Sequence, residues 1–77
     1  MNGVVMNTGE MEKYLFKRYK DFVRRQLLLT KSSVISHWEV IQELEVILNT
    51  FFEYDFPYTN NHYMAIKNEK TVYEYDV

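Results

Sequence analysis

The chain has 77 residues, a formal net charge of −2 and no cysteine, and 47% of its residues are hydrophobic and 17% aromatic. This length predicts one small domain, the hydrophobic content excludes a disordered segment, and the lack of thiols excludes disulfides and thiolate metal sites. A chain this short buries little apolar surface, so we expect dense aromatic packing and self-association to stabilise it.

The N-terminal residues carry no secretion signal. Residues 1–11 contain neither a basic segment nor a long apolar run, and the longest unbroken apolar run is residues 63–66. A membrane-spanning helix needs about 20 such residues. We therefore expect a cytoplasmic protein that makes no contact with a membrane. Residues with AT-rich codons are frequent and Ala65 is the only alanine, which suggests a low-GC bacterium or one of its viruses, with the host cytoplasm as the location in the viral case.

The first helix is predicted over about residues 8–30. Asn7 and Glu10 have the spacing of a capping box, and Glu10 suits the positive end of a helix. Apolar residues then recur with the helical period on one face, and basic residues occupy the other. The apolar residues are Met11, Leu15, Phe16, Tyr19, Phe22, Val23, Leu27 and Leu29. Residues 1–7 form either a short strand or a frayed tail.

The second helix is predicted over about residues 37–53. Ser36 and Glu39 have the spacing of a capping box, so Ser36 is the expected N-cap. The helix should end near Glu53, because Pro57 biases the residue before it away from the helical conformation. Its apolar face comprises Val40, Ile41, Leu44, Ile47, Leu48, Phe51 and Phe52.

A β-hairpin is predicted over about residues 62–76, after a loop. Side chains alternate in character along both halves of this segment, as in half-buried strands. A two-residue turn at Asn68-Glu69 is expected to join the strands, and a loop of three to five residues is the alternative, because Asn-Glu is a weaker turn signal than Asn-Gly. The two-residue turn predicts three inward-facing pairs. These pairs are Ile66 with Thr71, Met64 with Tyr73, and His62 with Tyr75.

The charges are segregated along the chain. Residues 13–31 carry a net charge of +6, and residues 36–55 carry a net charge of −5. We interpret this first as two helices of opposite charge that attract each other, within one chain or across a dimer. A second interpretation is a basic face that binds nucleic acid or an acidic partner. A third is an acidic second helix that docks a basic partner. The residues expected to contact nucleic acid are Lys13, Lys17, Lys20, Arg24 and Arg25.

An aromatic cluster follows the second helix. Aromatic residues are enriched in cores and at the centres of protein interfaces, and the acidic residues within this cluster would repel a phosphate backbone. We therefore expect the cluster to be core or protein interface. Trp38 lies off the apolar stripe of its helix and is an equally good candidate for packing or for contact with a partner. The predicted partner-binding residues are Trp38, Phe51, Phe52, Tyr54, Phe56 and Tyr58.

No catalytic or metal motif is present. Serines and two histidines occur, but none has the spacing of a nucleophile with its base, and His37 lacks the His-Glu-x-x-His spacing of a zinc site. We therefore expect neither enzymatic activity nor a cofactor.

Together these patterns predict a small α+β domain, in which a two-helix antiparallel hairpin is followed by a C-terminal β-hairpin, assembled as a homodimer. The leading functional hypothesis is a non-enzymatic protein-interaction or regulatory module, such as a viral or mobile-element accessory protein that acts on a host protein. The alternative is a nucleic-acid-binding protein that uses the basic face of the helix at 8–30.

Overall fold

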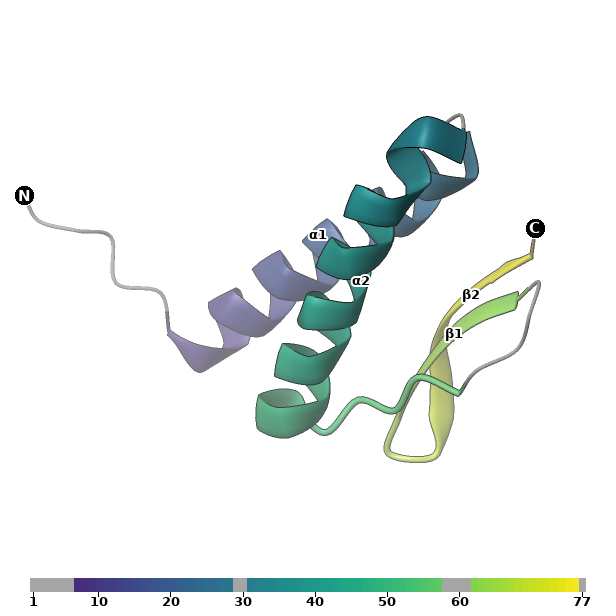
Figure 1. The fold of residues 1–77 in the computed structure, drawn as a ribbon. Coiled ribbons are helices and arrows are strands. Elements are labelled where there is room, and N and C mark those ends of the chain that lie inside the picture. The colour runs from purple at the N-terminus through teal and green to yellow at the C-terminus, as the bar shows by residue number, and fades with distance from the viewer. Residues whose placement is uncertain (1–6, 29–30, 58–61, 77) are drawn as a thin grey trace, which may run out of the picture.

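The computed structural model describes residues 7–28, 31–57 and 62–76. The elements are helix α1 (Thr8–Leu28), helix α2 (Lys31–Phe52), strand β1 (His62–Lys67) and strand β2 (Lys70–Asp76). The helices run antiparallel, and the strands form an antiparallel hairpin beside the helix pair (Figure 1). The predicted α+β arrangement, two helices followed by a β-hairpin, is confirmed. The predictions for residues 1–6 lie outside the described residues.

Helix α1 begins at the predicted capping box. The backbone N–H of Glu10 donates to Asn7 Oδ1 at 2.8 Å, and the backbone N–H of Asn7 donates to Glu10 Oε1 at 3.3 Å. Each side chain thus satisfies a backbone donor that the first turn of a helix leaves unpaired. The helix then turns Tyr19 and Val23 into the core, where both are fully buried.

Helix α2 begins earlier than expected. It starts at Lys31, so Ser36 lies inside the helix and is not its N-cap. The Ser-x-x-Glu pattern was therefore misleading, because a capping box contributes only about 1 kcal/mol. Extension of the helix by several residues adds a backbone hydrogen bond for each, and this gain exceeds the preference for a cap at Ser36.

The end of α2 leads the chain back onto the hairpin. Glu53 has a left-handed φ of 61°, and the Tyr54 N–H donates to the Leu48 carbonyl at 3.3 Å. Asn49 Nδ2 donates to the Tyr54 carbonyl at 2.7 Å, which holds the reversal in place. Asp55 then pairs with Ile66 of β1 through two backbone hydrogen bonds of 2.7 and 2.8 Å. β1 therefore has a partner on each edge.

Aromatic rings join the helices to the hairpin. Phe16 of α1 stacks on Tyr54 at 5.0 Å between ring centroids and meets Tyr73 of β2 edge-on at 6.0 Å. Tyr19 packs on Phe56 at 4.9 Å and on Tyr73 at 5.8 Å. The core therefore lies between the two layers. Its buried residues are Tyr19, Val23, Ile41, Leu44, Leu48, Phe52, Tyr54, Ala65 and Tyr73.

The two-residue turn is confirmed, but the predicted strand register is only partly correct. Asn68 and Glu69 both have positive φ, and Ile66 pairs with Thr71 as predicted. The register then shifts between Ala65 and Ile66, so that Tyr73 pairs with Ala65. Because side chains alternate between the faces of a strand, this one-residue shift turns the other set of β1 side chains inward.

The predicted inward face of β1 was therefore wrong. Ala65 is fully buried and Tyr63 packs against the core, whereas His62 pairs with Asp76 and Met64 with Glu74. On β2, both Tyr73 and Tyr75 pack toward the core as predicted.

Candidate interaction surfaces

The predicted partner-binding aromatics fall into three environments. Phe52 and Tyr54 are buried in the core, and Phe56 packs against it. Trp38 is partly buried and meets Tyr63 of β1 edge-on at 6.3 Å, so it helps to dock the hairpin on α2. Phe51 is 71% exposed. Tyr58 lies outside the described residues.

Phe51 belongs to an apolar surface that crosses from one helix to the other. Phe51 and Ile47, the latter 36% exposed, lie one turn apart on α2, and Met11 of α1 is 44% exposed. These three residues line a shallow hollow of about 390 Å³ together with Asn7, Thr8 and Phe52. An exposed aromatic side chain beside two other exposed apolar side chains is typical of an interaction site.

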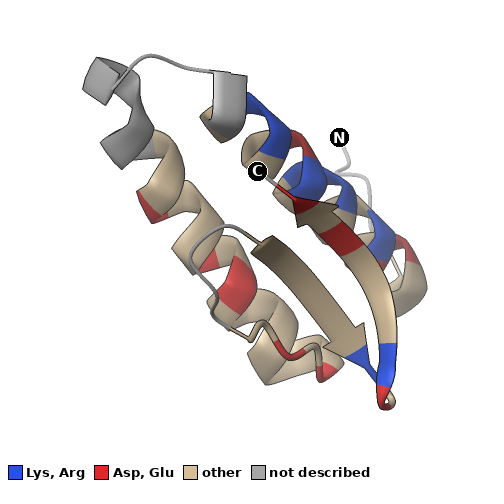
Figure 2. Cartoon of the chain, turned by 90° about the vertical axis from the view of Figure 1, so that its right-hand side faces the viewer, with Lys and Arg blue, Asp and Glu red and all other residues tan. Residues whose placement is uncertain are grey.

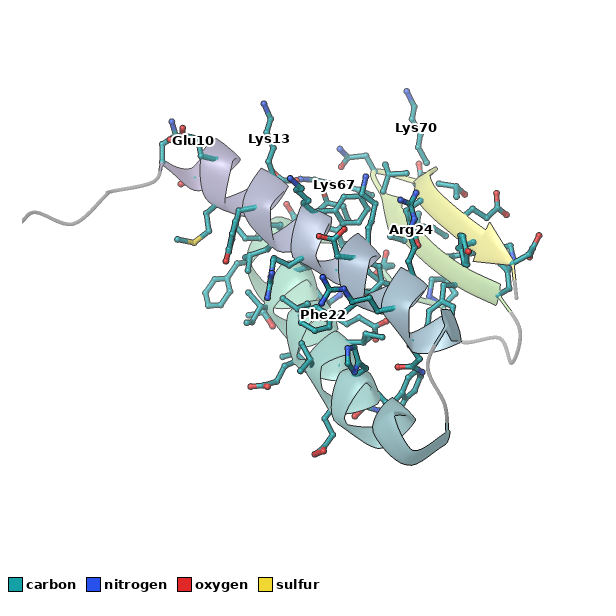
Figure 3. All side chains as sticks on the ribbon, turned by 90° about the horizontal axis from the view of Figure 1, so that it is seen from above. Glu10, Lys13, Phe22, Arg24, Lys67 and Lys70 are labelled. Carbon is teal, nitrogen blue, oxygen red and sulfur yellow. The ribbon has the colours of Figure 1, made fainter. Side chains whose placement is uncertain are left out.

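This surface lies on the side of the helices away from the hairpin. Glu12 and Tyr19 of α1 contact the hairpin. Met11 and Arg18 each come one position earlier, and one position along a helix is a rotation of about 100°, so their side chains point away from these contacts. Phe22 extends from α1 on the opposite side from Lys13 (Figure 3).

Phe22 continues the same surface at the other end of the helices. Its ring contacts that of His37 on α2 at 5.4 Å, and Arg18 lies over the Phe22 ring at 5.0 Å. Glu43 is exposed and lines a second shallow hollow with Ile47. We call this surface the open helical face. It comprises Met11, Arg18, Phe22, His37, Glu43, Ile47 and Phe51.

The basic residues of α1 form a separate surface. Lys13, Lys17, Lys20 and Arg24 recur at helical spacing, and all but the partly buried Lys20 are exposed. We call these four residues the basic stripe. Figure 2 shows basic residues along α1 beside β2, and in Figure 3 Lys13, Arg24 and Lys70, the first residue of β2, extend to the same side. The structure does not bring Arg25 into this stripe, because it lies about 100° around the helix from Arg24.

The oppositely charged helices do not form ion pairs with each other in the described part of the chain. Glu39 and Glu43 of α2 are exposed, and the ion pairs present in that part involve His62 and Lys67 instead. Lys20 lies over the Phe16 ring at 5.5 Å, a cation–π contact within α1. The charged faces of both helices therefore remain accessible.

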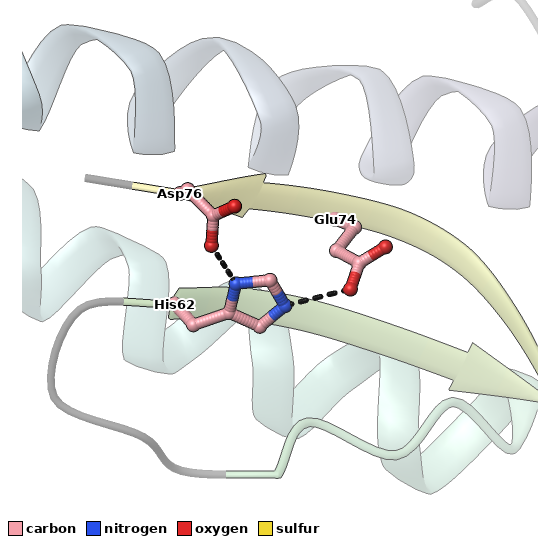
Figure 4. Close-up of polar contacts among 3 residues, drawn as sticks. All are labelled: His62, Glu74 and Asp76. Atoms are coloured by element: carbon pink, nitrogen blue, oxygen red, sulfur yellow. Dashed lines mark hydrogen bonds and ion pairs between the residues drawn. The ribbon is translucent and has the colours of Figure 1, made fainter.

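His62 joins two acidic residues on the outer face of the hairpin. Its Nε2 lies 2.8 Å from Glu74 Oε2, and its Nδ1 contacts Asp76 Oδ1 (Figure 4). The hydrogen bond to Asp76, followed by that to Glu74, raises the pKa of His62, opposed by partial desolvation. A doubly protonated imidazole donates from both nitrogens, so the charged form satisfies both carboxylates.

A second polar cluster fastens the start of α1 to the hairpin. Glu12 accepts from the Tyr54 hydroxyl at 2.7 Å and from Lys67, and the Lys67 ammonium lies 4.8 Å from the centroid of the Tyr54 ring. Hydrogen bonding by Lys67, then by Tyr54, lowers the pKa of Glu12. Burial, and then Glu12, raise the pKa of Tyr54. Sequence spacing gives no sign that Glu12 meets Tyr54 and Lys67, which are 42 and 55 positions away, so this cluster was not predicted.

The described residues hold neither a metal-ligand cluster nor a membrane-spanning helix. There, no group of three or more His, Asp or Glu side chains is arranged to hold a metal ion. Neither described helix combines the length and apolar character that a membrane span requires. Comparisons of the chain with protein-family models, with curated proteins and with solved structures found no match.

Proposed function

We propose that the protein is a non-enzymatic interaction module and that its open helical face binds a protein partner. The exposure of Phe51 beside Met11 and Ile47 carries this proposal, because an aromatic side chain in an apolar setting is typical of the centre of an interface. Full burial of such a side chain contributes about 1.5–3 kcal/mol. Phe52, which is buried in the core, lines the same hollow as Phe51.

Site-specific photo-crosslinking tests this proposal in cells. A benzophenone amino acid at position 51 is expected to form a covalent adduct with a protein that lies on the open helical face. The control is the same amino acid at Val72, which is 46% exposed but lies on the hairpin. Adducts of equal yield from both positions, or none from position 51, would contradict the proposal.

A nucleic-acid-binding function is the second candidate, and the basic stripe favours it. Four cations at helical spacing, none of which takes part in the ion pairs of the described residues, present a continuous positive surface. Neutralisation of phosphates by such residues makes affinity fall steeply with salt. The stripe offers few groups that read base edges, so binding without sequence preference is expected.

Charge reversal at neighbouring positions tests this second candidate. Lys17→Glu removes a cation from the basic stripe, whereas Arg18→Glu removes one from the open helical face. If nucleic acid binds the stripe, anisotropy of a labelled oligonucleotide will show a larger loss of affinity and a shallower salt dependence for Lys17→Glu alone. Equal losses in both variants, or no binding by the wild-type protein, would argue against it.

A further inference from the structure

We propose that the partner on the open helical face is a second copy of this chain, related to the first by a two-fold axis that lies in the plane of that face, between α1 and α2 and parallel to them. This inference rests on the proposed function and specifies the occupant of the same surface. Three properties of the face support it, namely which residues of α1 and α2 lie opposite each other, the charges at its centre, and its area.

Contacts between the helices show which residues of α1 and α2 lie opposite each other. Phe22 contacts His37 at one end of the face, and Met11 shares a hollow with Ile47 and Phe51 at the other. Because α1 and α2 run antiparallel, interpolation between these two contacts places Arg18 opposite the turn of α2 that contains Glu43. The middle of the open helical face therefore carries a cation on α1 and an anion on α2.

A two-fold axis between these two side chains makes the face complementary to itself. The rotation places α1 of each copy over α2 of the other, so Arg18 of each copy meets Glu43 of the second copy. Because this rotation preserves the position along the helices, it places Phe51 of each copy over the Met11 end of the second copy's α1. Phe22 of each copy meets the His37 end of the second copy's α2. Each contact then occurs twice in the dimer, with the roles of the two copies exchanged, as a two-fold interface requires.

The size of the face also fits a second copy. Helices of 21 and 22 residues span roughly 30 Å, and two of them side by side are roughly 20 Å wide, so the face covers roughly 600 Å² in projection. A standard stable interface buries about 800 Å² of accessible surface on each partner, the same order of area. The hairpins and the basic stripes remain on the outside of such a dimer.

Solution mass provides the primary test. Light scattering and sedimentation equilibrium of the wild-type protein should give twice the 9.4 kDa mass of one chain. Phe51→Glu should yield a monomer with an unchanged circular dichroism spectrum, because the substitution lies at an exposed position. A wild-type protein that stays monomeric at sub-millimolar concentration would overturn the inference.

A charge swap tests the geometry independently. Arg18→Glu and Glu43→Arg should each weaken the dimer about tenfold, since each creates two like-charged contacts across the axis. The double variant Arg18→Glu/Glu43→Arg should restore the wild-type dissociation constant, because the opposite charges face each other again. The control is Lys17→Glu, a reversal at an exposed position outside the face that should leave the dimer intact. A double variant weaker than both single variants would refute this arrangement.

The two proposals fail in different ways. Adducts from position 51 that contain two copies of this chain support both. A monomeric wild-type protein whose position 51 links to a different protein would overturn self-association and leave the proposed function standing. A monomeric protein with no adduct at position 51 would overturn both.

Discussion

At the scale of single residues, two polar clusters connect segments that are far apart in the sequence. Glu12, near the start of α1, binds Tyr54 and Lys67, and His62 binds the two acidic residues of β2. Each cluster contains a group whose pKa is shifted by its neighbours, in opposite directions, so each makes the stability of the fold depend on pH in its own range.

The His62 cluster is expected to stabilise the protein in acid. The pKa of His62 is raised in the folded state. Its contribution to stability is therefore complete below the unfolded pKa of about 6.5 and is lost as the pH rises through the folded pKa. Urea unfolding of wild type and His62→Gln should therefore differ more at pH 5.5 than at pH 9. An equal difference at both pH values would mean that the charged imidazole makes no net contribution.

The Tyr54 hydroxyl is expected to stabilise the fold through Glu12. Tyr54→Phe removes a hydrogen bond to a carboxylate and should lower the free energy of unfolding by about 1–2 kcal/mol at pH 7. Since the pKa of Glu12 is lowered, the contribution of its charged form is present above the unfolded pKa and is lost as the pH falls through the folded value. Tyr14→Phe, at a side chain that is 49% exposed, is the control and should change stability little.

At the scale of elements, the hairpin turn is the position where local preference and structure disagree. The φ angles of Asn68 and Glu69 are 55° and 63°, both in the left-handed region. A two-residue hairpin turn of this kind requires positive φ at both central positions, which Asn and Gly accept readily and Glu does not. The turn therefore forms despite a local conformational cost at Glu69.

Glu69→Gly is expected to stabilise the protein by about 0.5–1 kcal/mol, because glycine adopts positive φ without steric cost. Thermal and urea unfolding measure the change. Lys70→Gly is the matched control, since Lys70 lies in β2, where glycine weakens a strand and should lower stability. A loss of stability in Glu69→Gly would show that this side chain makes a contribution larger than its backbone cost.

At the scale of the whole molecule, the fold consists of two thin layers around a core of aromatic and aliphatic side chains. The molecule measures only 15 Å along its shortest principal axis, and the rings of Phe16, Tyr19 and Tyr73 make the contacts between the layers. The helices therefore have one side covered by the hairpin and the open helical face uncovered. This asymmetry is the physical basis of both proposals above.

Adjacent substitutions in β2 test the contact between the layers. Tyr73→Ala removes a side chain that is 9% exposed and should lower the free energy of unfolding by about 3–5 kcal/mol. Val72→Ala removes an exposed side chain and should change it by less than about 0.5 kcal/mol. A larger loss of stability for Val72→Ala than for Tyr73→Ala would contradict this assignment of the two faces of β2.

The sequence by itself determined the elements of this protein. Helical periodicity, the Asn7 capping box and strand alternation depend on neighbours within a few residues, so the two helices and the hairpin were predictable. The basic stripe was predictable for the same reason, because spacings of three, four and seven residues already place its members on one side of a helix.

Only the tertiary structure decided how these elements meet. The bulge near Ala65 exchanges the faces of β1, and the start of α2 at Lys31 overrides the cap expected at Ser36. Within the aromatic cluster, Phe52 and Tyr54 are buried and Phe51 is exposed. The aromatic character of these residues does not by itself distinguish the buried ones from the exposed one. The register of β1 and the burial of the aromatic cluster depend on contacts between residues distant in sequence, and such contacts outweigh local preferences of about 1 kcal/mol. The earlier start of α2 reflects the backbone hydrogen bonds that a longer helix gains.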